Sequence, residues 1–96
     1  LRFIVDRYFK NEPMDDVNKM LFAFAAYNAG PARVRDLRDE AAEMGYNPNI
    51  WFDHVEVAAA KSIGRETVQY VGNIYKYYIA YRLAADQIEK KERLLK

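Results

Sequence analysis

The sequence predicts an all-α fold of about five helices joined by short connections. Apolar residues recur at helical spacing along most of the chain, no segment alternates as a strand does, and Asn, Gly and Pro separate the periodic segments. Hydrophobic residues make up 51% of the 96 residues, so the chain is one domain, or part of one, with a core of moderate size.

A break separates the first two predicted helices. Leu1–Lys10 places most of its apolar side chains on one side, which is typical of a short amphipathic helix. Asn11–Pro13 interrupts this pattern. Either Asp15 or Asp16 can cap the second helix, because a carboxylate accepts hydrogen bonds from the free amides of a first turn. We expect this helix to end near Tyr27.

The end of the second helix combines buried and polar residues. Residues 21–27 are apolar or aromatic without a charge, and a helix that is hydrophobic all round must lie inside the fold. Asn28 follows, and Gly30 can take the left-handed conformation that ends a helix. Pro31 suits the first turn of the next helix. The sequence therefore predicts a buried helix that brings Tyr27 and Asn28 to a corner of the fold.

The middle of the chain is predicted to hold two helices around an aromatic loop. Residues 32–44 show helical spacing, and Gly45 should end that helix. Trp51 and Phe52 follow a turn, and we expect them to anchor the loop to the core. Asp53–Glu56 has the spacing of a capping box, so a short fourth helix should begin there.

The longest predicted helix covers residues 65–85, about 30 Å at 1.5 Å per residue. The charged residues 86–96 either extend this helix or form a frayed tail, and the sequence leaves both alternatives open. We therefore divide the chain into a helical unit over residues 1–85 and a tail over residues 86–96.

Composition excludes several classes of function. The formal net charge of +1 lacks the basic excess typical of nucleic-acid-binding proteins, so we predict no nucleic-acid partner. Without cysteine, and with His54 as the single histidine, the chain has no Cys/His metal cluster, and we predict neither a metal nor another cofactor. No stretch approaches the roughly 20 apolar residues of a membrane span.

Because the chain starts at Leu1, we expect a piece of a longer protein, whose targeting signal lies elsewhere.

Tyr27, Asn28 and Tyr70 are the candidate binding residues. A core tyrosine and a helix-ending asparagine would explain Tyr27 and Asn28 structurally, whereas an amide that donates and accepts also suits the edge of a ligand cleft. Five of the eight tyrosines lie between Tyr70 and Tyr81, and packing explains most of them. Tyr70 lies near the start of its helix, where a cleft is more plausible, so it could present its ring and hydroxyl to a sugar or another amphipathic ligand.

The remaining polar and aromatic residues favour structural roles. Glycoside cleavage needs a carboxylic acid with a raised pKa, but Glu12 and Glu66 lie among polar neighbours that would not desolvate them. We expect His54 to be solvated or locally hydrogen-bonded, and Trp51 to anchor its loop more readily than to stack on a sugar. The arginines of the third helix should form a solvated face, although this face could meet an anionic polymer; they are Arg33, Arg35 and Arg38.

Two motifs resemble those of one enzyme family. Residues 24–31, Phe-Ala-Ala-Tyr-Asn-Ala-Gly-Pro, resemble the Ala-Tyr-Asn-x-Gly motif of lytic transglycosylases with the soluble-lytic-transglycosylase, or goose-type lysozyme-like, domain. Residues 66–71, Glu-Thr-Val-Gln-Tyr-Val, resemble the later Glu-Thr-x-x-Tyr-Val motif of the same family. The motifs stand in the family's order, and the resemblance covers residues 1–83. The insert with Trp51 is most similar to the membrane-bound branch that carries a periplasmic-binding domain.

The resemblance implies a lysozyme-like, all-α domain that acts on peptidoglycan glycan strands in the periplasm or cell envelope of a bacterium. In this family a glutamate protonates the glycosidic oxygen between MurNAc and GlcNAc. The 6-hydroxyl of the muramic acid then closes on the anomeric carbon and gives a 1,6-anhydro product. Carried over to this chain, Tyr27 and Asn28 would line the cleft, and Tyr70 would help to hold the glycan or the acid.

One part of the family pattern is absent. The catalytic Glu-Ser motif and the following Gly-x-x-Gln-x-Met-like segment lie upstream in the family, and neither occurs in these 96 residues. We therefore expect the C-terminal half of a catalytic domain, without its catalytic residue and inactive alone. A non-catalytic helical module that binds glycan or a protein is the alternative. An incomplete domain should expose apolar surface, so we also expect a possible homodimer, and the parent protein could be membrane-associated.

Overall fold

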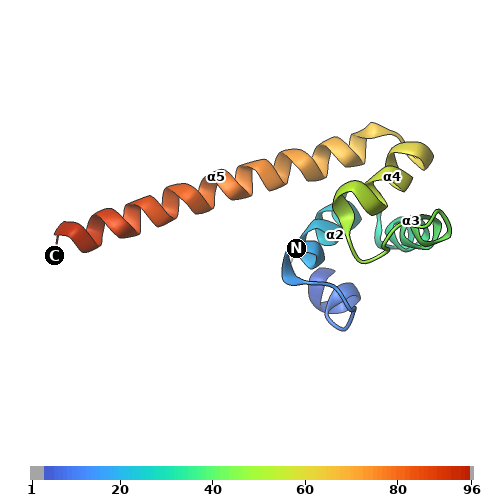
Figure 1. Cartoon of the computed structure of the whole chain (residues 1–96), viewed down its shortest axis with the longest axis horizontal. Coiled ribbons are helices and arrows are strands. Elements are labelled where there is room, and N and C mark those ends of the chain that lie inside the picture. The colour runs from blue at the N-terminus through green and yellow to red at the C-terminus, as the bar shows by residue number, and fades with distance from the viewer. Residues whose placement is uncertain (1–3, 96) are drawn as a thin grey trace.

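The computed structural model describes residues 4–95, and every regular element within this range is helical. The all-α class expected from the sequence is confirmed, and the arrangement is consistent with part of a lysozyme-like domain. Figure 1 shows a cluster of short helices from which the last helix extends. In chain order the elements are η1 (Val5–Phe9), α2 (Asp16–Ala29), α3 (Pro31–Glu43), η2 (Trp51–Val55), α4 (Glu56–Ser62) and α5 (Arg65–Leu95).

The predicted N-terminal helix is present within the described range as a helical turn. The helical turn η1 begins at Val5 and ends at Phe9, while residues 1–3 of the expected helix lie outside the described residues. Phe9 is buried, and its ring centroid lies 6.0 Å from that of Phe22 in α2. This contact attaches η1 to the helix around which the core forms.

Helix α2 is the centre of the fold. Its residues 21–26 are all buried, as their uninterrupted apolar character predicts. It packs against η1, α3 and α5. The Asp15 carboxylate caps its first turn by accepting from the Asn18 amide at 2.8 Å, so Asp15, of the two candidates, is the capping residue.

Gly30 makes the corner between α2 and α3. Helix α2 continues to Ala29, two residues beyond the predicted end, and the Gly30 amide donates to the Ala26 carbonyl at 2.8 Å. Gly30 has a φ of 98°, which disfavours any residue with a Cβ. Pro31 then occupies the first turn of α3, as predicted.

Helix α3 carries one arginine whose exposure was predicted wrongly from the sequence. Arg33 and Arg35 are exposed as expected, but Arg38 is half-buried. Its Nε donates to the Pro48 carbonyl at 2.9 Å, and its Nη2 donates to Asn49 Oδ1 at 2.7 Å. The loop after α3 folds back over this side chain, which periodicity along a helix cannot reveal.

The loop before α4 is anchored by Trp51, as predicted. This residue has no exposed surface, and its ring meets Phe22 edge to face at 5.8 Å. The capping box that follows is only half formed. The Asp53 amide donates to Glu56 Oε1 at 3.2 Å, but α4 begins after Val55 and has no side-chain cap. Asp53 has a φ of 64°, so the chain kinks where the sequence predicted a cap.

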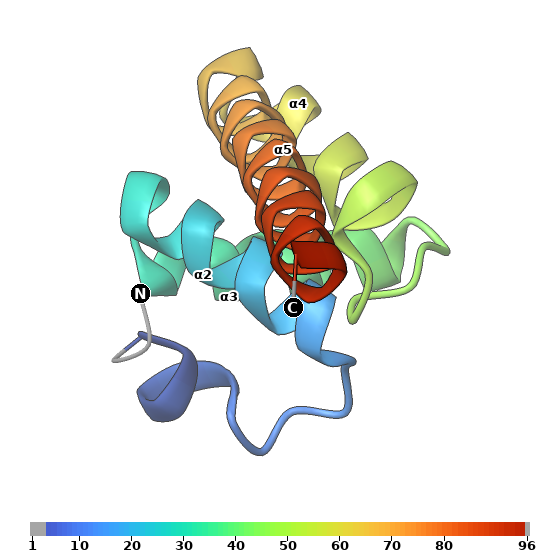
Figure 2. The same cartoon turned by 90° about the vertical axis from the view of Figure 1, so that its left-hand side faces the viewer.

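Helix α5 spans Arg65–Leu95 and so includes residues 86–95. At 1.5 Å per residue its length is about 46 Å. It packs against α2 and α4, and its C-terminal half projects from the cluster of helices (Figures 1 and 2). This projection gives the molecule its longest dimension of 54 Å, against 27 and 22 Å for the other two.

Candidate functional site

The corner after α2 presents the first two candidate residues at the surface. Tyr27 has 68% of its surface exposed, and Asn28 is also exposed. The preceding turns of α2 are buried, so they hold the backbone of this corner in place. The structural alternative of a core tyrosine is therefore wrong for Tyr27, and its ring is accessible to a ligand.

Asn28 has a hydrogen-bond partner 39 positions later in the chain. Thr67 Oγ1 donates to Asn28 Oδ1 at 2.7 Å. Thr67 is only 4% exposed, and it lies in the first turn of α5. With its oxygen occupied in this way, the amide keeps its two Nδ2 hydrogens as donors for another group.

The start of α5 explains why Thr67 reaches α2. Gly64 has a φ of 87° and separates α4 from α5. Helix α5 then begins at Arg65 and packs along α2, so its first turn lies against the end of that helix. The hydroxyl of a buried threonine needs a hydrogen-bond partner, and the Asn28 amide is that partner.

Tyr70 lies one turn after Thr67 on α5. It is half-buried and packs against the hydrophobic core. Within residues 4–95, no hydrogen bond or ring contact joins it to Tyr27 or Asn28. The structure therefore brings Asn28 to the second motif through Thr67, while Tyr70 packs against the hydrophobic core.

The other tyrosines of α5 divide into packed and exposed side chains. Tyr75 lies against Phe52, with 5.2 Å between the ring centroids. The Tyr78 hydroxyl accepts from Arg82 at 2.9 Å. Tyr77 and Tyr81 are 73% and 71% exposed. Packing therefore explains only part of this group.

The two candidate carboxylic acids lack the surroundings of a catalytic acid. Glu66 is exposed in the first turn of α5. A negatively charged side chain is stabilised there by the positive end of the helix dipole. Glu12 pairs with Arg38 at 3.2 Å, and its side chain is 38% exposed. Neither side chain is desolvated, as the acid of glycoside cleavage must be.

His54 and Trp51 have structural roles. His54 Nδ1 accepts from the Asn47 amide at 2.9 Å, so the expected local hydrogen bond is present. Trp51 is completely buried, which excludes sugar stacking on its ring. Across residues 4–95, no three His, Asp or Glu side chains gather as a metal site would require. None of the helices in this part of the chain combines the length and apolar character of a membrane span.

Thr67 contacts the candidate site, and sequence reasoning did not single it out. It stands inside the segment Glu66–Val71, yet periodicity alone marks it as one more residue at the start of an amphipathic helix. Its position in the second motif was the only signal in the sequence. The 2.7 Å contact with Asn28 shows that the two motifs meet in space.

Comparison with known proteins gives the class of this chain: it is a region related to lytic transglycosylases. The relatives that match this chain are each named membrane-bound lytic murein transglycosylase F. The protein of Shewanella woodyi is 37% identical in an alignment 91 residues long, and the match covers 81% of this chain and 18% of the relative. The protein of Shewanella loihica is 34% identical in an alignment 80 residues long, and the match covers 70% of this chain and 17% of the relative.

A third relative has the same printed name and similar coverage. The protein of Shewanella baltica is 35% identical in an alignment 80 residues long, and the match covers 70% of this chain. The chain thus spans less than a fifth of the length of these curated relatives. No family profile matches the chain, and the search of solved structures gave no significant match.

Proposed function

We propose that this chain forms one wall of the glycan cleft of a peptidoglycan lytic transglycosylase. The relatives are lytic murein transglycosylases by name, and the hydrogen bond between Thr67 and Asn28 carries the argument for the site. It joins two segments that resemble family motifs and orients an exposed amide. Tyr27 beside it offers an accessible ring and hydroxyl, which suit the apolar face and hydroxyl groups of a sugar.

In the proposed reaction, an acid outside these 96 residues protonates the glycosidic oxygen between MurNAc and GlcNAc. The C1–O bond breaks, and the protonated oxygen leaves as a hydroxyl of GlcNAc. The muramic 6-hydroxyl bonds to C1, gives its proton to the carboxylate of the same acid and closes the 1,6-anhydro ring. Tyr27, Asn28 and Tyr70 hold the glycan or the acid and do not transfer the proton. The exposed Glu66 and the paired Glu12 support the view that the catalytic acid lies elsewhere.

The proposed setting is the bacterial cell envelope, in the periplasm, with peptidoglycan strands as the partner and a parent protein that is membrane-associated. The printed names of the relatives, which include both "membrane-bound" and "murein", support this setting. A non-catalytic glycan-binding module remains the second candidate function, because the exposed amide and tyrosine serve binding without an acid.

Binding of a glycan oligomer to the 96-residue chain tests the site. A GlcNAc tetramer titrated into ¹⁵N-labelled protein should shift the amide signals around Tyr27, Asn28 and Thr67. Asn28→Ala and Tyr27→Phe should each weaken the affinity, about fivefold to tenfold for one lost hydrogen bond. Tyr77→Phe is the matched control, because Tyr77 is equally exposed but lies on the projecting helix. Unchanged affinity in both site variants would refute the assignment.

Turnover tests the absence of the acid. The chain alone should release no anhydro-muropeptides from purified sacculi, as judged by mass spectrometry of the soluble fraction. Release of these products by the 96-residue chain would contradict the proposal that the acid lies elsewhere. Glu66→Gln would then show whether this exposed carboxylate takes part.

A further inference from the structure

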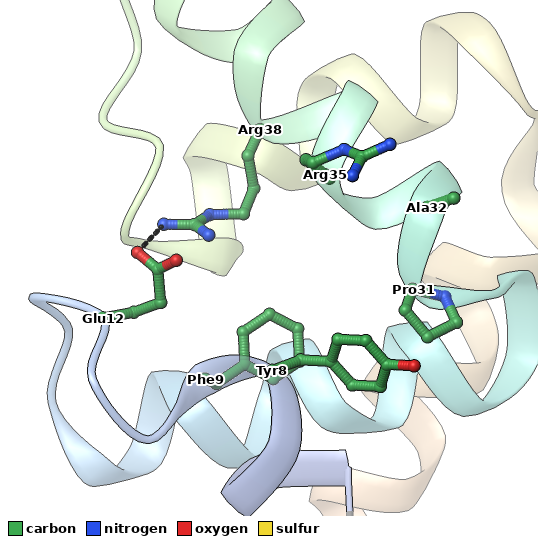
Figure 3. A pocket seen from close by; sticks show the side chains of 7 residues that line it. All are labelled: Tyr8, Phe9, Glu12, Pro31, Ala32, Arg35 and Arg38. Atoms are coloured by element: carbon green, nitrogen blue, oxygen red, sulfur yellow. Dashed lines mark hydrogen bonds and ion pairs between the residues drawn. The ribbon is translucent and has the colours of Figure 1, made fainter.

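A pocket of about 350 Å³ lies where η1 meets the N-terminal half of α3. It is separate from the corner formed by Tyr27 and Asn28, although Pro31 on its edge lies only three positions after Asn28 in the chain. Figure 3 shows its walls: aromatic rings from η1 on one side and two arginines from α3 on the other. The lining residues are Tyr8, Phe9, Glu12, Pro31, Ala32, Arg35 and Arg38.

One side of the pocket is apolar and partly open. Phe9 is buried and fixed against Phe22 of the core. Tyr8 is 44% exposed, and in Figure 3 its ring points toward Pro31 across the floor of the pocket. An aromatic ring facing a proline makes a surface on which a small apolar group loses contact with water.

The opposite side carries fixed positive charge. Arg38 is held by Pro48 and Asn49, and its guanidinium also lies 5.4 Å from the centre of the Phe22 ring. Its Nη1 donates to no residue within 4–95. Arg38 therefore presents a pre-oriented guanidinium edge to the pocket, at no further entropic cost.

Arg35 and Glu12 set the charge of the pocket. Arg35 is exposed and makes no hydrogen bond or ion pair with the described residues. Glu12 pairs with Arg38 at 3.2 Å and neutralises one of the two cations. The lining residues carry two arginines and one glutamate, a formal charge of +1, and the Arg7 guanidinium lies 5.7 Å from the Tyr8 ring beside the pocket. A dianionic phosphate would face the Glu12 carboxylate, so a carboxylate is the better match.

We propose that this pocket binds the carboxylate of a small amphipathic ligand, with the anion on Arg35 and Arg38 and the apolar body on Tyr8 and Pro31. A short peptide that ends in alanine has this chemistry: a methyl group beside a carboxylate. The peptides of peptidoglycan are one source of such a group, and this source rests on the proposed function. A free N-acylated amino acid is the other source and does not depend on it.

The test is a pair of titrations that differ in one charge. N-acetyl-D-alanyl-D-alanine and its C-terminal carboxamide are titrated into the 96-residue chain by NMR. The acid should bind at least tenfold more tightly and shift the signals of Tyr8 and Arg35. Arg35→Gln should abolish this preference, whereas Arg33→Gln, an exposed arginine outside the pocket, should preserve it. Equal binding of acid and carboxamide, or equal loss in both arginine variants, would overturn the proposal.

Two further arms identify the source and separate the two proposals. A sugar-free wall peptide ending in D-alanine that binds more tightly than N-acetyl-D-alanine assigns the carboxylate to wall peptides, while equal affinity assigns it to small free acids; each outcome supports the pocket. If the GlcNAc tetramer binds at Asn28 and the peptide acid does not bind, the pocket proposal fails and the glycan site stands. If only the peptide acid binds, the pocket stands and the glycan site fails.

Discussion

Thr67 Oγ1 donates to Asn28 Oδ1 at 2.7 Å and so ties the first turn of α5 to the last turn of α2. The donor is buried, whereas the acceptor belongs to an exposed residue. The buried hydroxyl of Thr67 thus orients the side-chain amide of Asn28 at the surface. It is the one described hydrogen bond between side chains that connects the two sequence motifs, and the proposed glycan site depends on it.

A double-mutant cycle should measure this connection. We expect a coupling free energy of about 0.5–1.5 kcal/mol between Thr67→Val and Asn28→Ala, determined by urea unfolding. Thr67→Ser keeps the hydroxyl and should retain the coupling. If Asn28→Ala has the same effect on stability with either Thr or Val at position 67, the contact contributes nothing.

The Asp15 cap should make stability depend on pH. The hydrogen bond from the Asn18 amide, and then that from the Asn18 side chain, holds the pKa of the Asp15 carboxyl below its usual value. The stabilisation is therefore present above the unfolded-state pKa of about 3.9, and it is lost as the pH falls through the folded-state pKa. Asp15→Ala should lower the Tm at pH 7, and this difference should shrink in acid.

Asp39→Ala is the matched control for that experiment, because Asp39 is an exposed carboxylate inside α3 and caps no helix. Thermal unfolding followed by circular dichroism at several pH values gives both comparisons. A difference between Asp15→Ala and the parent that stays constant down to pH 2 would rule out the ionised cap.

Arg38 should contribute strongly to stability although it is a charged residue. Arg38→Met keeps the apolar stem over Phe22 but removes the donors to Pro48 and Asn49, and we expect a loss of about 1–3 kcal/mol. Urea unfolding measures this value. Arg33→Met, on the exposed face of the same helix, should change stability by no more than about 0.5 kcal/mol. Equal effects would mean that the loop does not depend on Arg38.

The pair between Arg38 and Glu12 should matter less. The Glu12 side chain is 38% exposed, so water screens much of its interaction with Arg38. Glu12→Gln should therefore cost less than about 1 kcal/mol. A larger loss in urea unfolding would show that the ion pair, rather than the contacts to the loop, holds Arg38.

Trp51 should be a central residue of the core and a probe of it. Its burial predicts blue-shifted fluorescence emission that moves to the red on unfolding. Trp51→Ala should cost about 3–5 kcal/mol. Within the described residues Trp51 Nε1 has no hydrogen-bond partner, so Trp51→Phe loses no hydrogen bond and should cost less. An equal cost for both variants would contradict this account.

The projecting half of α5 should mediate self-association. Tyr81, Ile88 and Leu95 recur seven residues apart and are 71%, 60% and 79% exposed. This spacing forms a seam that a second copy of the helix can cover. We expect a homodimer in sedimentation at micromolar concentration, and Ile88→Glu should weaken it at least tenfold. Gln87→Glu adds the same charge beside the seam and should not. A monomer at all concentrations would refute the seam.

Much of the fold follows from local sequence. The uncharged segment of residues 21–27 was predicted to be buried, and this is correct for residues 21–26 but wrong for Tyr27. Asp15 had the chemistry of a cap, and Gly30 followed by Pro31 had the chemistry of a corner. These features depend on residues within a few positions of one another. The helices were therefore predictable, apart from their ends and the kink at Asp53, where backbone conformation departs from the capping pattern.

The features of the candidate site also divide into those set by local sequence and those set by contacts between distant residues. The sequence by itself determined that Tyr27 and Asn28 follow a buried helix, and that Tyr70 belongs to the first turns of a long one. Only the tertiary structure decided that Tyr27 is exposed, that Trp51 is not, and that Thr67 holds Asn28. It also decided that Arg38 is covered by its loop. Each of these depends on contacts between residues far apart in the chain, and helical periodicity carries no information about such contacts.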